Sequence, residues 1–225
     1  MPSDFPRSPK LLKGALVAYQ SQFLGPVPNV IVLQYNPDQL NRTLTNRSER
    51  SQTGSVGEAR EDALQVLGPP IETTTITVVL EATDQLAEPT QNPQIVVHGL
   101  HPALAALELL LYPPSSQVLL NRTLARAGTA QIRPADVPMV LFVWGRSRVV
   151  PVRLTSFSVT EQAFDQALNP IRAEVQLGMR VLTYMELKES SLGYNAYLAT
   201  QTQKEVLARL NLGSSAEQAI GTLPF

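Results

Sequence analysis

A run of three strand-like segments begins with Val137-Pro138-Met139-Val140-Leu141-Phe142-Val143-Trp144-Gly145 and continues over residues 148–160 and 172–184. β-Branched and other apolar residues fill these segments, and Pro, Gly and Asn residues separate them, a pattern that predicts a β-meander. In the third segment apolar residues alternate with charged and amide residues, so one face should be covered and the other wet. We interpret the meander as a building element of a sheet rather than as a reaction site.

Further strands are predicted on the N-terminal side of the meander. Apolar and β-branched residues occur over 11–20 and again over 30–35, where the second run ends at Asn36-Pro37 because proline has no N–H to donate to a ladder. Residues 71–81 are rich in Thr, Val and Ile, and their alternation indicates one covered and one partly wet face. The chain is therefore predicted to be mainly β, a β-barrel or β-sandwich.

One helix is predicted within this β-rich body. Residues 102–112 carry Ala and Leu at helical spacing, with Pro102 suited to the first turn and Pro113-Pro114 as a stop. A lone apolar stripe of this kind must be buried somewhere. We expect this helix to lie across an open side of the sheet and to seal it.

A short C-terminal helix is predicted over residues 202–211, where Thr202 and Glu205 form a capping box and Val and Leu residues form an apolar stripe. A helix this short is marginal alone, so we expect it to dock on the body or on a partner. The polar stretches 41–70 and 115–136 show no such pattern and are expected to be long connections.

Composition divides the chain into three parts. Residues 1–10 hold three prolines and little that could pack, so they are expected to form a flexible arm. Residues 11–187 contain the predicted strands and the packed helix and should form the β domain. Residues 188–225 should form a C-terminal tail with the short helix.

Charge and cysteine content exclude several classes of protein. The 225 residues include 18 Lys and Arg against 19 Asp and Glu, so no broad field favours nucleic acid or an anionic membrane. The chain has no cysteine, which excludes disulfides and thiol chemistry. We also expect no signal peptide, because residues 1–10 lack the apolar segment that one needs, and no membrane insertion, because no apolar run reaches about 18 residues.

The residues that could carry chemistry are few. His98 and His101 are spaced for a shared metal only in a helix, which Gly99 and Pro102 would break. Neither a Gly-x-Ser-x-Gly elbow nor a phosphate-binding P-loop occurs. We therefore predict that the chain is not an enzyme and binds neither a metal nor a cofactor.

Several short motifs occur in a fixed order between residues 11 and 187. An early strand runs into Tyr35-Asn36-Pro37, a Pro-x-x-x-Phe-x-Trp-Gly pattern follows, and a Pro-x-Arg-Ala turn leads into the last strand. Together they resemble the tube-type proteins of contractile injection systems, and specifically the tube-initiating baseplate component of these phage-tail-like particles. The structural or interface residues implied by the resemblance are Tyr35, Asn36, Pro37, Pro138, Phe142, Trp144, Gly145, Phe157, Phe164, Pro170, Arg172 and Ala173.

The resemblance implies a structural protein that forms a ring, expected to be a homohexamer, between the spike or hub and the inner tube, where it initiates tube assembly. Its partners would be copies of itself, the inner tube protein, and the spike, hub and other baseplate proteins. It further implies cytoplasmic assembly in the producing bacterium as part of a phage-tail-like particle. Many members continue into a peptidoglycan-binding LysM module, and we expect none in the tail of this chain.

Two alternatives stay open. Within the same class, the chain could be an inner-tube subunit or a tube-end cap. In a different class, it could be a ligand-binding β-barrel module with Trp144 as a stacking platform, although a tryptophan preceded by apolar strand residues favours a core or subunit-interface position.

Overall fold

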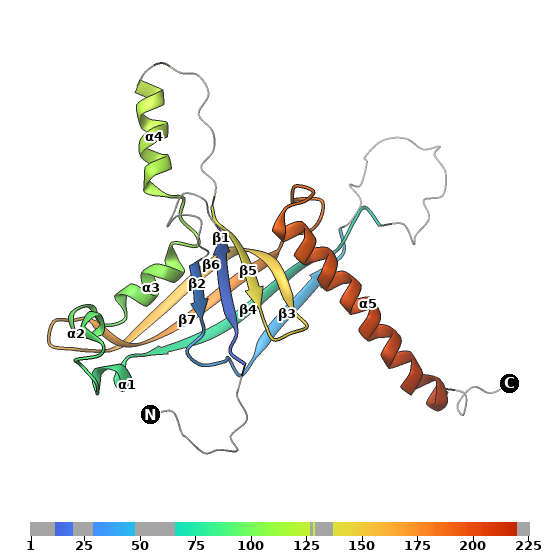
Figure 1. Ribbon diagram of the computed structural model, residues 1–225, viewed down its shortest axis with the longest axis horizontal. Helices are drawn as coiled ribbons and strands as arrows, with labels where there is room; N and C mark the ends of the chain where they lie inside the picture. The colour runs from blue at the N-terminus through green and yellow to red at the C-terminus, as the bar shows by residue number, and fades with distance from the viewer. Residues whose placement is uncertain (1–11, 20–28, 48–65, 127, 129–136, 220–225) are drawn as a thin grey trace, which may run out of the picture.

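The computed structural model describes residues 12–19, 29–47, 66–126, 128 and 137–219, with side chains up to Asn211 in the last range (Figure 1). Within these ranges the chain forms seven strands and five helices. The arm predicted over residues 1–10 lies outside the described residues, as does much of the connection predicted over 41–70.

The strands form one antiparallel sheet in the order β2-β1-β5-β6-β7-β4-β3. Their bounds are β1 Ala15–Tyr19, β2 Asn29–Val32, β3 Leu40–Thr45, β4 Ile71–Glu81, β5 Met139–Val143, β6 Val149–Phe164 and β7 Pro170–Val181. The mainly-β prediction is confirmed, and the predicted meander is β5, β6 and β7. The prediction of a β-barrel or β-sandwich is met only in part, because in the described part of the chain the strands form a single open sheet, not closed into a barrel, with β2 and β3 as its edges.

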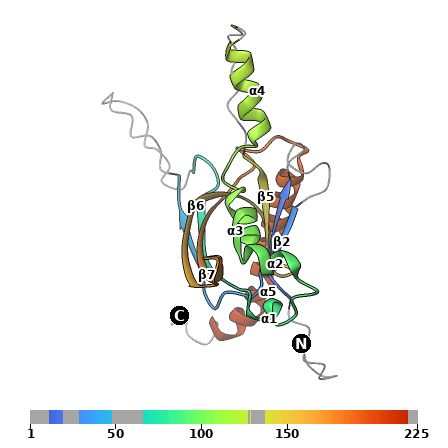
Figure 2. The same cartoon turned by 90° about the vertical axis from the view of Figure 1, so that its left-hand side faces the viewer.

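The curved sheet has two arms, β2-β1-β5 and β6-β7-β4-β3 (Figure 2). Across its open side, a side chain rather than a β-ladder joins the two arms. β4 runs to Glu81, but its ladder with β3 ends at Ile76. Gln34, just after β2, donates its side-chain N–H to the Glu81 carbonyl at 2.7 Å and accepts the Glu81 backbone N–H at 2.9 Å. The amide of Gln34 thus occupies the place of a strand at the end of β4, and the sheet curls without closing.

One hydrophobic core lies inside this curve. Figure 2 shows α3, His101–Glu108, between the two arms of the sheet. Leu100, Leu104, Leu107 and Leu110 are buried there, so the predicted helix and its packing on the sheet are confirmed. The strands contribute Leu16, Ile76, Val78, Leu80, Val140, Phe142, Val150, Val152, Ala173, Val175, Leu177, Met179 and Val181 to the same core.

β6 changes its inward face at an irregularity between Leu154 and Ser156. Before this point Val150, Val152 and Leu154 are buried, and after it Phe157 and Val159 pack against the core. An extra residue in a strand shifts the alternation of side chains by one. This shift explains why both faces of the segment look partly apolar in the sequence.

Two predicted connections contain regular structure instead. β3 lies in the predicted loop 41–70, and α4, Ser115–Arg126, lies in the predicted loop 115–136. β3 is an edge strand with mostly exposed residues, so no clean alternation marks it. α4 projects from the body in Figures 1 and 2, and its consecutive residues Val118, Leu119 and Leu120 are exposed rather than arranged as a stripe towards the sheet.

The short helix predicted over 202–211 is part of a longer one, α5, which spans Leu192–Ala219. Its first turn is capped by Ser191, whose Oγ accepts the backbone N–H of Tyr194 at 3.2 Å. Thr202 therefore lies in the helix interior, and its predicted capping role is wrong. The remaining helices, α1 Thr83–Leu86 and α2 Pro93–His98, connect β4 to α3.

Candidate assembly surface

The two edge strands present half-exposed apolar side chains. Val30 and Val32 of β2 are 53% and 55% exposed, and Leu44 of β3 is 52% exposed. An edge strand also offers a row of backbone N–H and C=O groups that can pair with another chain. Because the edges lie on opposite ends of one sheet, a copy has two different surfaces through which it can join others head to tail.

The motif Tyr35-Asn36-Pro37 fixes the turn after β2 to the start of β1. The Asn36 side chain accepts the Gly14 N–H at 2.9 Å through Oδ1 and donates to the Leu12 carbonyl at 2.8 Å through Nδ2. Leu33 adds a backbone hydrogen bond to the Gly14 carbonyl at 2.9 Å. Asn36 thus holds the hairpin that positions edge strand β2, whereas the Tyr35 ring is exposed.

An open hollow of about 600 Å³ lies beside this turn. It occupies the face of β4 and β7 that is turned away from the core, and polar residues dominate its wall. The lining residues are Tyr35, Asn36, Pro37, Asp38, Gln39, Asn41, Thr75, Thr77, Val79, Glu81, Glu174 and Gln176. Of the predicted site residues, only those of the Tyr35-Asn36-Pro37 motif border it.

Trp144 packs on the core rather than on the hollow. Its ring lies 5.7 Å from that of buried Phe142, centroid to centroid. It also covers Gly14, where a Cβ would come within 2.9 Å of the Trp144 ring. The backbone N–H of Trp144 donates to the Arg148 carbonyl at 2.8 Å, across the turn that contains Gly145. Pro138 is buried at the other end of the strand.

The second group of motif residues lies at the β6–β7 hairpin. The Pro170 carbonyl accepts the Leu100 N–H at 2.9 Å, which ties the hairpin to the start of α3. Ala173 is fully buried and Phe157 partly so, whereas Phe164 and Arg172 are exposed. In the part of the chain described, the predicted residues therefore form separate structural groups rather than one pocket.

Sequence reasoning missed an ionic cluster beneath α5. Glu72 of β4 is only 7% exposed, accepts a hydrogen bond from Arg42 Nε at 2.8 Å, and lies 3.4 Å from Lys204 Nζ. Burial alone would raise the pKa of Glu72, but the Arg42 hydrogen bond and the positive charges of Lys204 and Arg42 outweigh it and lower the pKa. The one available signal was Glu72 itself, a carboxylate in phase with the covered residues Thr74 and Ile76.

The N-terminal half of α5 is fixed on the body by several contacts. Thr200 is buried and donates through Oγ1 to the Val149 carbonyl at 2.8 Å. The Tyr197 ring lies 6.0 Å from that of Tyr184, and a Cβ at Gly193 would come within 2.6 Å of the Met139 sulfur. Together with Lys204, these residues hold α5 across β6 and the start of β4.

The two histidines lie at exposed positions, His98 at the end of α2 and His101 at the start of α3. Across the residues with defined positions, no three His, Asp or Glu side chains gather where they could hold a metal ion. In the same part of the chain, none of the helices combines the length and apolarity needed to cross a lipid bilayer.

Comparison of the chain with protein-family models gave no match, and comparison with curated proteins gave none either. The described residues by themselves define a mainly-β protein with an open, curved sheet that ends in edge strands β2 and β3.

Proposed function

We propose that this chain is a ring-forming structural subunit of a contractile injection system, an adaptor between the spike or hub and the inner tube that initiates tube assembly. The observation that carries the proposal is the open sheet with half-exposed apolar residues on both edge strands, Val30 and Val32 on β2 and Leu44 on β3. Pairing β2 of one copy with β3 of the next satisfies both edges, and a repeated head-to-tail contact closes into a ring when its rotation allows.

The positions of the motif residues support this function. Asn36 holds the β1–β2 hairpin, Trp144 packs at the end of β5, and Pro170 anchors the start of β7. Each therefore stabilises the geometry of a strand in the curved sheet, and of the three only Asn36 also borders the open hollow. The packing of Trp144 on Phe142 also disfavours the alternative in which Trp144 is a ligand-stacking platform.

The outer face of the sheet is suited to a water-filled channel. On β4 and β7 it carries Thr73, Thr75, Thr77, Glu174 and Gln176, whose side chains remain hydrated without a partner protein. A ring built through the sheet edges would bring this polar stretch of β4 and β7 from every copy onto one surface. The core face would then remain covered by α3 and α5.

Labelling this subunit in assembled particles tests the proposal. When the chain is produced with the tube, spike and hub proteins, electron microscopy should show the label in a single ring at the spike end of the tube. Label along the whole tube would instead identify an inner-tube subunit, and label at the far end a cap. Particles that form normally without the chain would contradict all three assignments.

A further inference from the structure

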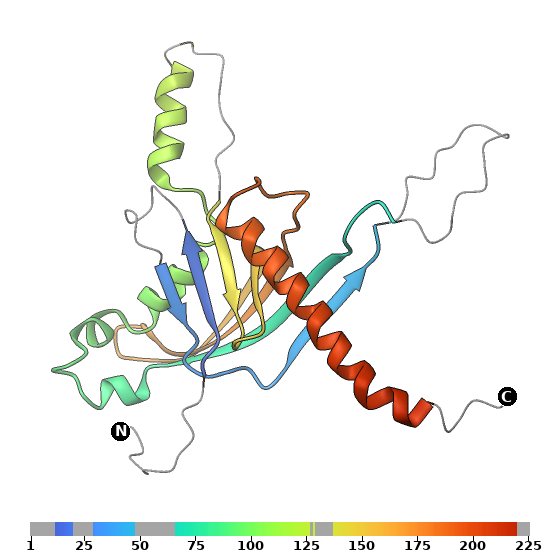
Figure 3. The same ribbon diagram turned by 45° about the vertical axis from the view of Figure 1, so that its right-hand side comes forward.

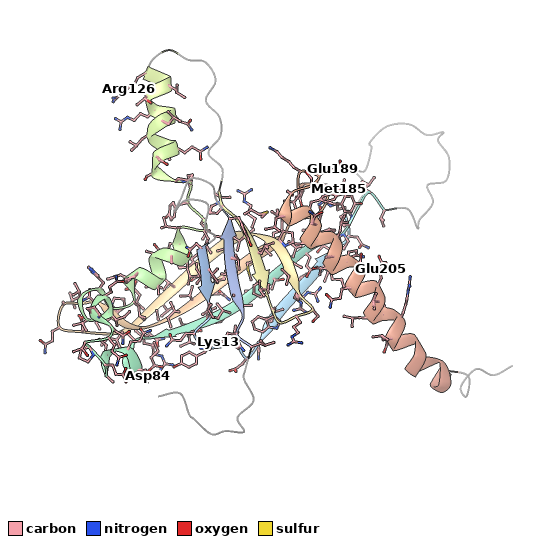
Figure 4. All side chains as sticks on the ribbon, in the orientation of Figure 1. Lys13, Asp84, Arg126, Met185, Glu189 and Glu205 are labelled. Carbon is pink, nitrogen blue, oxygen red and sulfur yellow. The ribbon has the colours of Figure 1, made fainter. Side chains whose placement is uncertain are left out.

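Helix α5 continues past the edge of the sheet that anchors it. Lys204 contacts Glu72 of β4, and Glu72 is the register partner of Leu44 on edge strand β3. Figures 1 and 3 show α5 crossing β3 and extending beyond it, and Figure 4 places Glu205 on this outer part. We refer to residues 205–211 as the distal segment of α5.

The distal segment carries an exposed apolar stripe. Leu207 is 49% and Leu210 69% exposed, and Val206 lies beside them. With 3.6 residues per turn, Leu207 continues the helix face that includes Thr200 and Lys204, and Leu210 lies on one flank of that face, about 80° from Thr200. Beyond the sheet, the face that rests on it in the first half of α5 therefore carries Leu207, with Leu210 on its flank.

The position of this stripe indicates what covers it. The contacts of Glu72 with Arg42 and Lys204 place α5 on the core side of β3 and β4. Half-exposed Leu44 lies on this same side of β3, next to Glu72. The space beyond β3 and beneath the distal segment is where a strand added to the β3 edge would lie. In a head-to-tail ring, that strand belongs to a second copy of this chain.

We propose that the distal segment of α5 lies over the joint between two copies and packs its apolar stripe on the neighbour whose β2 pairs with β3. This inference rests on the proposed ring function and adds a lateral contact to it. Each joint would then be held by backbone hydrogen bonds along the edge and by burial of Leu44, Leu207 and Leu210. The Lys204–Glu72–Arg42 contacts set the direction in which the helix reaches across.

The test uses the full-length chain and two matched double variants. Leu207→Glu/Leu210→Glu adds two carboxylates to the stripe. Asn195→Glu/Thr202→Glu adds two carboxylates at exposed positions on the side of α5 opposite Thr200 and Lys204. Oligomer mass is measured by light scattering over a range of protein concentrations, and circular dichroism reports whether each variant is folded. If the first variant does not fold, Leu207→Ala/Leu210→Ala takes its place.

We expect a ring for wild type, an unchanged control, and a stripe variant that needs at least tenfold higher concentration to assemble. A stripe variant that assembles like wild type would overturn the α5 contact while leaving the ring function intact. Single rings that persist but no longer stack would also overturn it, because the contact would then be axial. A wild-type chain that stays a single copy at every concentration would remove the ring function itself.

Discussion

At the scale of single residues, Gly99 shows how a backbone contact fixes a residue type. It joins α2 to α3 with φ of +55°, and a Cβ there would lie 2.6 Å from the Pro170 carbonyl oxygen. Gly145 also has positive φ, +73°, but a Cβ added to it would have no atom within 4 Å. Gly99, with ψ of −136°, therefore combines a backbone conformation that glycine alone adopts readily with a steric contact, whereas at Gly145 no contact adds to the cost of a positive φ.

We therefore expect Gly99→Ala to destabilise the fold by more than Gly145→Ala. The left-handed conformation costs a non-glycine residue about 1–2 kcal/mol, and this should be the whole loss at Gly145. At Gly99 the displaced Pro170 carbonyl adds to that loss and weakens its hydrogen bond to Leu100. Urea unfolding of the two variants measures the difference, and equal losses would show that the Gly99 contact relaxes freely.

At the scale of elements, the attachment of α5 to the sheet depends on ionised Glu72. Because the folded-state pKa of Glu72 is lowered from 4.5, the unfolded chain takes up a proton first as the pH falls. The stabilisation from this carboxylate is thus fully present above about pH 4.5 and is lost as the pH falls through the folded-state pKa.

Glu72→Gln should therefore cost about 1–3 kcal/mol at neutral pH, because it weakens charge-assisted contacts of a buried carboxylate. This cost should shrink as the pH falls below about 4.5. Thermal unfolding of the variant and of wild type, measured at about one-unit steps of pH from about 3 to about 8, gives their difference in stability at each pH. Glu174→Gln, at an exposed position on the other face of the sheet, is the control and should show no such trend. A constant difference at every pH would contradict the ionic attachment.

The elements differ in how well the sequence predicted them. β4 was predicted with its observed bounds, 71–81, because it is buried on one face and alternates strictly. β3 was missed because an edge strand buries little, and its hydrogen bonds to β4 leave no trace in its own sequence. The start of α5 was missed because it packs through small residues, Gly193 and Thr200, so no apolar stripe marks that half of the helix.

The candidate surface was predictable only in part for a related reason. The motif residues Asn36 and Trp144 could be selected from the sequence, and both hold strands in place. The contact of Glu72 with Arg42 and Lys204 joins three segments far apart in the chain, and the segment of Arg42 was predicted as a loop. The bridge from Gln34 to Glu81 likewise depends on the curvature of the whole sheet.

At the scale of the whole molecule, we propose a protomer whose sheet is completed by its neighbours. Two edges, an outer polar face and a helix that extends past β3 belong to one arrangement. The projecting helix α4 also exposes apolar residues, with Arg126 at its far end in Figure 4, but it is no part of the sheet. It therefore offers a matched control for a test of the edges.

The most direct test is the mass of the purified chain in solution, measured by native mass spectrometry for wild type and two double variants. Val30→Lys/Val32→Lys places charges on edge strand β2, and Val118→Lys/Leu119→Lys places the same charges on α4. We predict a closed ring for wild type and for the α4 variant, and single folded copies for the β2 variant. Single copies of the wild-type chain, or rings of the β2 variant as stable as those of wild type, would contradict assembly through the sheet edges.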